Sequence, residues 1–284
     1  MGADWTVREI LKWTRGYFKD AGIVQPRLEA EILLAHVLNV DRLHLYLSPD
    51  KPLTLDERAQ YREAIKKRCS GTPLQYLTGE ISFFGLRFRV SSEALIPRQE
   101  TEELLEKALA LVPRDREISC LDLGTGSGVL AVCLARFLPR ARITAIDLSE
   151  EALALARENA RLHDVFDRIT FLRSYWFERV SGKFDLIVSN PPYIAEEELV
   201  SLPVEVRAHE PRVALDGGKE GTKQIESLTS SLKEYMLPNA SVLLEIGNGQ
   251  GRTVVERMDA VGLVEARMER DIAGKERFVI ARCP

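Results

Sequence analysis

The sequence predicts a protein of two domains, a small helical one followed by a larger α/β domain with a mostly parallel sheet. Three observations support this. With 284 residues, the chain exceeds the usual size of a single domain, about 100 to 200 residues. Apolar residues in its first part recur at helical spacing. From Thr101 onward, apolar segments typical of strands alternate with amphipathic segments typical of helices, an order that gives parallel sheets covered on both faces.

The helical domain is predicted to span residues 1–77. Apolar residues recur at spacings of three to five between Trp5 and Phe18, and again between Ala30 and Leu38. Thr54 is a plausible N-cap of a later helix, with Glu57 three residues on in the position of a capping box. These segments predict a small helical bundle.

One face of that later helix is basic, because Arg58, Arg62 and Lys66 follow one another at intervals of four residues. Such a stripe is usually a solvated face, and the alternative is a docking surface for an acidic partner or RNA.

Residues 78–97 are predicted to form a β-hairpin linker, because aromatic and aliphatic residues are interrupted there by Gly79 and Gly85. The remaining residues, 98–284, then form the α/β domain. Its strands are expected at 118–123, 142–147, 169–172, 184–189, 241–246 and 277–282, and its helices at 102–111, 129–138, 150–163, 222–235 and 252–260. Ligands of such folds bind at the carboxyl ends of the strands.

Composition excludes several classes of protein. A net charge of −4 and a pI of 5.8 do not suit a protein that grips long nucleic acid through its phosphates. No apolar run reaches the roughly 18 to 20 residues of a membrane span, and the polar N-terminus does not resemble a signal peptide. We therefore expect a cytoplasmic protein. No metal site is predicted, because the four cysteines and four histidines show no ligand spacing.

A glycine-rich loop follows the first predicted strand of the α/β domain and consists of Gly124, Thr125, Gly126, Ser127 and Gly128. Glycines allow a tight turn and the close approach of a ligand. The pattern differs from the G-x-G-x-x-G fingerprint of dinucleotide sites and lacks the ending of a P-loop. Asp147 ends the next strand, where a carboxylate can accept hydrogen bonds from both hydroxyls of a ribose. Loop and acid together favour a nucleoside cofactor, NAD included, over a merely structural turn.

A second motif, Asn190-Pro191-Pro192-Tyr193, follows the strand at 184–189. By itself it is a rigid turn, since two prolines fix φ and remove two donors. Beside a nucleoside site it acquires a chemical interpretation. Asn190 Oδ1 and the Pro191 carbonyl can each accept one hydrogen of a planar –NH2 group and hold its nitrogen in line with an electrophilic methyl group. Tyr193 can stack on the flat substrate group.

Together with several other segments, these motifs make the chain resemble the release-factor glutamine N5-methyltransferases, also called the HemK family. The resemblance covers nearly the whole chain. It is carried by Pro73-Leu74-Gln75-Tyr76-Leu77-x-Gly79, Phe84-Gly85, Leu95-Ile96-Pro97-Arg98-x-Glu100-Thr101-Glu102, Leu121 to Gly128, Val188 to Ile194, Glu210-Pro211, Gly217-Gly218, Glu245-Ile246-Gly247 and Asp271-x-x-Gly274-x-Glu276-Arg277.

The resemblance implies a class I (Rossmann-like) methyltransferase domain that uses S-adenosyl-L-methionine, and a helical domain that helps to hold the release factor. It implies that Gly124 to Gly128 and Asp147 contact the cofactor, that Trp176 lies near the adenine, with a core tryptophan as the alternative, and that Asn190 also touches the cofactor. Residues 190–193 would bind the glutamine of the Gly-Gly-Gln motif, with Asn190, Pro191 and Tyr193 as the catalytic groups.

The chain departs from the family pattern at two positions. Gln99 replaces a proline, and Tyr175 stands where many relatives have an aspartate, which puts an acidic contact to the adenine amino group in doubt. Arg98 and Glu210 are either pocket-wall residues or a structural salt bridge. The rival functions are an N6-adenine methyltransferase acting on DNA or RNA, which shares the Asn-Pro-Pro-Tyr loop, and an inert binding module. A monomer without stable nucleic-acid binding is expected.

Overall fold

The computed structural model describes residues 5–284, and the chain divides into two compact units. Unit 1 consists of the residues up to Gly79 together with Val204–His209, and unit 2 consists of Glu80–Pro203 and Glu210–Pro284. The chain therefore passes between the units three times. No helix within the described residues is long and apolar enough to cross a membrane.

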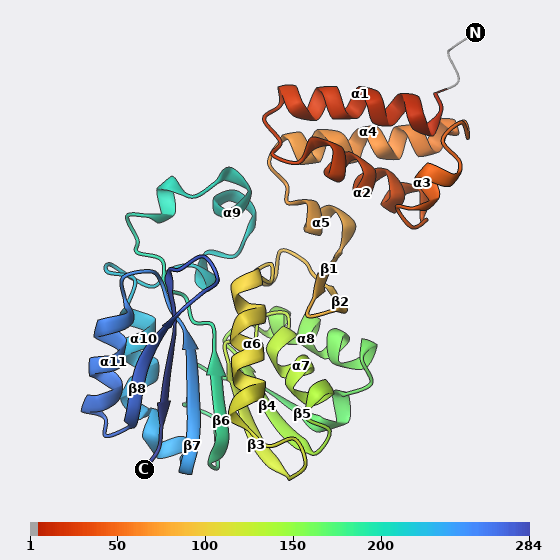
Figure 1. Cartoon of the computed structure of the whole chain (residues 1–284). Helices are drawn as coiled ribbons and strands as arrows, with labels where there is room; N and C mark the ends of the chain where they lie inside the picture. The colour runs from red at the N-terminus through yellow and green to blue at the C-terminus, as the bar shows by residue number, and fades with distance from the viewer. Residues whose placement is uncertain (1–4) are drawn as a thin grey trace. The chain divides into compact units, whose positions relative to one another are not determined.

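Unit 1 is a bundle of short helices (Figure 1). Tyr61 is fully buried at its centre, and its hydroxyl donates to the Ala30 carbonyl. The predicted capping box is confirmed, because the Thr54 side chain accepts from the Glu57 N–H while the Glu57 carboxylate accepts from the Thr54 N–H. The helices are α1 (Val7–Asp20), α2 (Pro26–Leu38), α3 (His44–Leu47), α4 (Leu55–Cys69), α5 (Leu74–Thr78) and α9 (Val204–His209).

Helix α9 belongs to this unit although it comes from the second half of the sequence. Arg68, buried on α4, binds Glu29 of α2 through Nε and Glu205 of α9 through Nη2, the latter at 3.0 Å. The guanidinium bridges two carboxylates from distant segments, an arrangement that its rigid fork of donors suits.

Unit 2 contains a seven-stranded sheet in the order β5-β4-β3-β6-β7-β9-β8. The first five strands in this order are parallel, and β9 runs antiparallel to both of its neighbours. The strands are β3 (Ile118–Leu123), β4 (Ala141–Asp147), β5 (Ile169–Arg173), β6 (Phe184–Ser189), β7 (Met236–Glu245), β8 (Val264–Arg270) and β9 (Glu276–Arg282).

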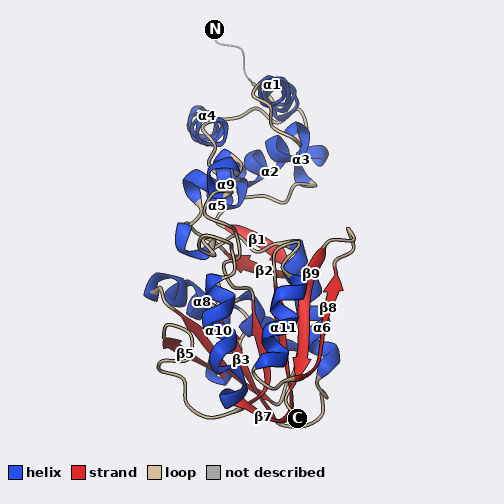
Figure 2. Cartoon of the chain, turned by 90° about the vertical axis from the view of Figure 1, so that its left-hand side faces the viewer, coloured by secondary structure: helices blue, strands red, loops and turns tan. Residues whose placement is uncertain are grey.

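Two apolar cores lie on opposite faces of this sheet, and helices flank it (Figures 1 and 2). Side chains alternate along β3, where Cys120 packs into one core and Leu121 into the other. The helices are α6 (Gln99–Leu111), α7 (Val129–Phe137) and α8 (Glu150–Leu162) on one side, and α10 (Lys223–Ser231) and α11 (Gly251–Ala260) on the other. The prediction of a mostly parallel sheet covered on both faces is confirmed.

Strand β8 was not predicted from the sequence. It lies at the edge of the sheet, and its residues, Val-Glu-Ala-Arg-Met-Glu-Arg, are mostly exposed or half-buried. An edge strand needs charged residues to resist pairing with other chains, so its sequence lacks the apolar run expected of a buried strand.

The predicted hairpin is present as β1 (Glu80–Phe83) and β2 (Leu86–Arg89). Phe84 and Gly85 both have positive φ, as a two-residue type I′ turn requires. Phe83 and Phe88 are buried in the core of unit 2. Asn159 of α8 bonds both the N–H and the carbonyl of Arg89 and donates to the Ser127 carbonyl. The hairpin is thereby anchored beside the glycine-rich loop.

Candidate active site

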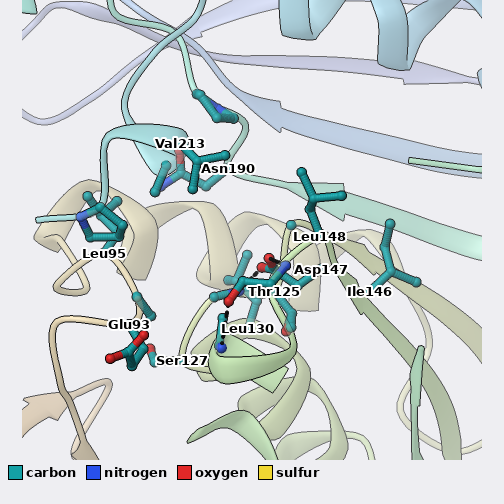
Figure 3. A pocket seen from close by; sticks show the side chains of 18 of the residues that line it. Glu93, Leu95, Thr125, Ser127, Leu130, Ile146, Asp147, Leu148, Asn190 and Val213 are labelled. Carbon is teal, nitrogen blue, oxygen red and sulfur yellow. Dashed lines mark hydrogen bonds between the residues drawn. The ribbon is translucent and has the colours of Figure 1, made fainter. Parts of the chain in front are cut away.

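Three adjacent parallel strands, β4, β3 and β6, end at the same edge of the sheet. Their carboxyl ends carry Asp147, the loop 124–128 and the loop 190–193. The three segments surround one cavity, shown with Thr125, Asp147 and Asn190 in Figure 3. Of the predicted site residues, those that line it are Gly124, Thr125, Gly126, Ser127, Asp147, Trp176, Asn190 and Pro192.

The three glycines of the loop have different roles. All have positive φ. A Cβ at Gly124 or Gly126 would meet nothing closer than 3.9 Å, so both present bare backbone to the cavity. A Cβ at Gly128 would lie 2.8 Å from Cβ of Ala156 on α8. Gly128 is not among the lining residues; it allows α7 and α8 to pack closely.

Asp147 is held by backbone donors. Its Oδ2 accepts from the Gly126 N–H at 2.8 Å and its Oδ1 from the Ser149 N–H at 3.0 Å. Burial raises the pKa of this carboxyl, and these bonds act in the opposite direction. Each carboxylate oxygen has a further lone pair. The side chain can therefore accept two more hydrogen bonds from a diol in the cavity.

Two buried polar atoms near the cavity have no partner within the described residues. They are Nε1 of Trp176 and Oδ1 of Asp122. Asp122 lies beneath the loop, where its other oxygen accepts from Thr125 and from the Ala131 N–H, and burial raises its pKa to about 7. An unpartnered indole donor, two bare glycines and an acid that can accept two more hydrogen bonds fit an adenosine-containing cofactor.

Asn190 is the half-buried polar residue of the Asn-Pro-Pro-Tyr loop that faces the cavity. Its Nδ2 donates to Oγ1 of Thr101 at 3.1 Å. Within residues 5–284 no group donates to its Oδ1 or to the Pro191 carbonyl, and of these two residues Asn190 lines the cavity.

Pro191 and Tyr193 do not line the cavity. The Tyr193 hydroxyl donates to Glu245 at 3.1 Å and accepts from Arg277 at 3.3 Å. Stacking of its ring on a substrate stays a prediction.

Arg98 and Glu210 form a salt bridge with each other, and the second Glu210 oxygen accepts from the Ile96 N–H at 3.2 Å. Neither residue lines the cavity. The salt bridge that was one of the two alternatives is therefore present.

Several lining residues were not predicted. Thr101 stands in a motif that carried the family resemblance, and this was the available signal; the structure shows it buried in the first turn of α6. Leu95 begins the motif that also contains Thr101, whereas Val213 comes from a distant segment to which no local pattern points (Figure 3). Tyr175 turns its hydroxyl toward Gln224 and Ser227, at 3.4 and 3.3 Å. Among the described residues, no cluster of three metal-binding side chains occurs.

Comparison with known proteins identifies the class. A model described as methyltransferase small domain matches residues 101–208. A methyltransferase from Pyrococcus furiosus superposes with a TM-score of 0.53 at 20% identity, covering 79% of this chain and 95% of that one. The 16S rRNA N2 G1207 methyltransferase of T. thermophilus gives 0.52 at 16% identity, covering 72% and 50%. With its glycine-rich loop and the acid that ends β4, the α/β unit is a class I methyltransferase domain.

Similar sequences identify the family within the class I methyltransferases. A model described as PrmC N-terminal domain matches residues 9–79. The release factor glutamine methyltransferase of Geobacter sulfurreducens is 41% identical over 98% of this chain and 97% of its own length. That of Chlorobaculum tepidum is 48% identical over 74% of this chain and 75% of its own. The chain belongs to the release factor glutamine methyltransferase family.

Proposed function

We propose that this chain transfers a methyl group from S-adenosyl-L-methionine to the side-chain amide nitrogen, N5, of the glutamine in the Gly-Gly-Gln motif of peptide-chain release factors. The observation that carries the proposal is the position of Asn190, whose amide lines the same cavity as Gly124 and Asp147. The names of the full-length relatives give the substrate class, and AdoMet is bound in a neighbour of the same fold.

The cofactor would be held by groups of three strand ends. Asp147 would accept hydrogen bonds from the ribose hydroxyls, and the Trp176 indole would lie against the adenine. The bare backbone at Gly124 and Gly126 leaves room for the cofactor, and Thr125 and Ser127, which also line the cavity, would contact it. When bound, the cofactor supplies a methyl group on a positively charged sulfur. Asp147 is half-buried, and the limited access of water strengthens each hydrogen bond that it makes.

The substrate amide poses a chemical problem that Asn190 and Pro191 address. The lone pair of an amide nitrogen is delocalised into its carbonyl, so the nitrogen is a weak nucleophile. Asn190 Oδ1 and the Pro191 carbonyl would each accept one N–H hydrogen, orient the nitrogen and stabilise the positive charge that develops on it. No general base is assigned, because a methylated amide nitrogen is strongly acidic and loses its proton readily.

The proposal is tested by incubating the purified protein with S-adenosyl-L-methionine and an unmodified release factor, followed by peptide mass spectrometry. One added methyl group on the Gly-Gly-Gln glutamine is expected. It should be absent from a release factor with alanine in place of that glutamine, and strongly reduced with the Asn190→Ala enzyme. Methyl transfer to an adenine oligonucleotide assayed in parallel, with none to the peptide, would replace the proposal by the N6-adenine reading.

We further propose that the enzyme acts in the cytoplasm as a monomer, as suits an enzyme whose substrate is itself a cytoplasmic protein. Light scattering of the purified chain should give the mass of a single copy, 32.0 kDa. A mass of twice that value would contradict this.

A further inference from the structure

A network of hydrogen bonds connects Asn190 and Tyr193 of the Asn-Pro-Pro-Tyr loop to Thr101 and Glu245. The proposed chemistry assigns no role to Thr101 or Glu245. Thr101, in the first turn of α6, accepts from Asn190 Nδ2 and donates to Oε2 of Glu245 at 2.8 Å. Glu245, the last residue of β7, is 1% exposed. Its other oxygen accepts from the Tyr193 hydroxyl. Thr101, Asn190, Tyr193 and Glu245 come from three of the motifs that carry the family resemblance, and these hydrogen bonds connect the three motifs.

The direction of each bond follows from the number of protons available. An ionised carboxylate only accepts, so Glu245 takes the single hydroxyl proton of Thr101. Thr101 Oγ1 can then only accept from Asn190, which places the Asn190 NH2 group toward Thr101. The Asn190 oxygen must face the other way, on the side of the cavity that this residue lines.

The far end of the chain of bonds is fixed by a permanent charge. Arg277 donates from Nη1 to the Tyr193 oxygen and to the Ile246 carbonyl, the latter at 3.1 Å. Its Nε donates to Asp271 at 3.3 Å. Because the Arg277 guanidinium only donates and cannot accept a hydrogen bond, the Tyr193 proton is directed to Glu245. Every bond between Arg277 and Asn190 then has a defined donor, and the donors on both sides point toward Glu245.

We infer that Thr101 and Glu245 are positioning residues that set the orientation of the Asn190 amide, and thereby present its oxygen, rather than its NH2 group, to the substrate nitrogen. Glu245 does not line the cavity, and Thr101, which does, is assigned no contact with the reacting atoms. The inference rests on the proposed function, since an oxygen is needed at this place only if the substrate brings N–H donors.

The direction of the hydrogen bond between Thr101 and Asn190 depends on the protonation of Glu245. The charged groups facing it are Arg277 on β9, which lowers its pKa, and Glu100 on α6, which raises it; the hydroxyls of Thr101 and Tyr193 lower it. Burial is the largest effect and raises the pKa to about 7. Because Arg277 donates to the Tyr193 oxygen, the Tyr193 hydroxyl continues to donate to Glu245. A proton gained by Glu245 therefore lies on Oε2, the oxygen that faces Thr101. The Thr101 hydroxyl would then donate to Asn190 and favour the flipped amide.

The kinetic test compares the pH dependence of kcat in wild type, Thr101→Val and Thr101→Ser. In the wild type, kcat should rise with pH through the Glu245 pKa of about 7. Thr101→Val keeps the shape but lacks the hydroxyl, and should lower kcat at high pH by about tenfold, the scale of one hydrogen bond. Its profile should be flat across this range, with the KM for release factor and the Kd for the cofactor unchanged. Thr101→Ser should restore both the rate and the rise.

A second readout needs no substrate. The side-chain NH2 signals of Asn190 in ¹⁵N spectra, assigned by their loss in Asn190→Ala, should shift with a midpoint at the Glu245 pKa in wild type and Thr101→Ser, and stay constant in Thr101→Val. The matched control is Thr229→Val on α10, which removes an equally buried hydroxyl bonded to the Ile225 carbonyl and should leave rate, profile and spectra as in wild type.

Either of two results would overturn the inference. One is a Thr101→Val enzyme that keeps the wild-type rate, or a proportionally lower rate with the wild-type pH rise. The other is an Asn190 signal that does not titrate in the wild type. A wild type that methylates no release-factor peptide, while its Asn190 signal titrates through Thr101, would refute the proposed function and leave the positioning intact.

Discussion

The two halves of the site are built in different ways. On the cofactor side, hydrogen bonds join residues close in sequence: Asp147 bonds Ser149, two positions on, and Gly126, 21 positions back. On the substrate side, Asn190 bonds a residue 89 positions away, and the next bond, from Thr101 to Glu245, spans 144. The cofactor side is therefore encoded in one stretch of sequence, whereas the substrate side exists only after the sheet has brought distant segments together.

The largest effect is expected from Asn190→Ala, which removes the substrate-side acceptor. Turnover should fall by about 10²- to 10³-fold, as when one preorganised transition-state contact is lost. Cofactor affinity should change little. Calorimetry with the cofactor measures the affinity, and single-turnover methylation measures the rate. Equal losses in both quantities would contradict the assignment of Asn190 to the substrate side alone.

Asp147→Ala should affect the other half. Loss of the half-buried carboxylate should weaken cofactor binding by about 10- to 100-fold, the scale of one or two hydrogen bonds to a charged group. The matched control is Asp185→Ala, an acid near the start of β6 that bonds Ser119 at the opposite end of the sheet. An Asp147→Ala protein with unchanged affinity by calorimetry would place the ribose elsewhere.

A pair of glycine variants separates ligand approach from packing within the loop. Gly128→Ala combines a positive φ with a clash against Ala156, and should lower the free energy of unfolding by about 2 kcal/mol. Gly124→Ala has the strain alone and should lose about 1 kcal/mol, but should weaken cofactor binding more. Urea denaturation and calorimetry give both numbers. A more destabilised Gly124→Ala protein would contradict these roles.

A smaller effect is expected from Asp122→Asn. Burial raises the folded-state pKa of Asp122 from 3.8 to about 7, so between these values the folded state holds a proton that the unfolded state has released. The contribution of Asp122 to stability is then present at low pH and lost as pH rises toward 7. The unfolding free energy of Asp122→Asn should accordingly fall less between pH 5 and pH 8 than that of wild type, by about 1 kcal/mol or more. A steeper fall in the variant would contradict the assignment.

The same contrast explains what could be predicted from the sequence. Strand ends, the glycine-rich loop, Asp147 and Asn190 could be placed because each belongs to a local pattern of apolar strand followed by polar turn. The role of Gly128 could not, since a glycine pattern does not say whether a ligand or a helix approaches it. Thr101 and Glu245 were noticed only as parts of motifs, because their partnership spans the domain.

The assignment of helix α9 to unit 1 determines how the protein behaves when it is truncated or cleaved by a protease. Residues 204–209 complete the N-terminal unit but are encoded after the Asn-Pro-Pro-Tyr loop. A fragment ending at Gly79 would lack this helix and leave Arg68 with one carboxylate partner fewer. A protease nick after Gly79 in the whole chain would leave α9 still packed in the first unit, so the two pieces should elute together until the fold is denatured. A single cut in the sequence therefore does not separate unit 1 from unit 2.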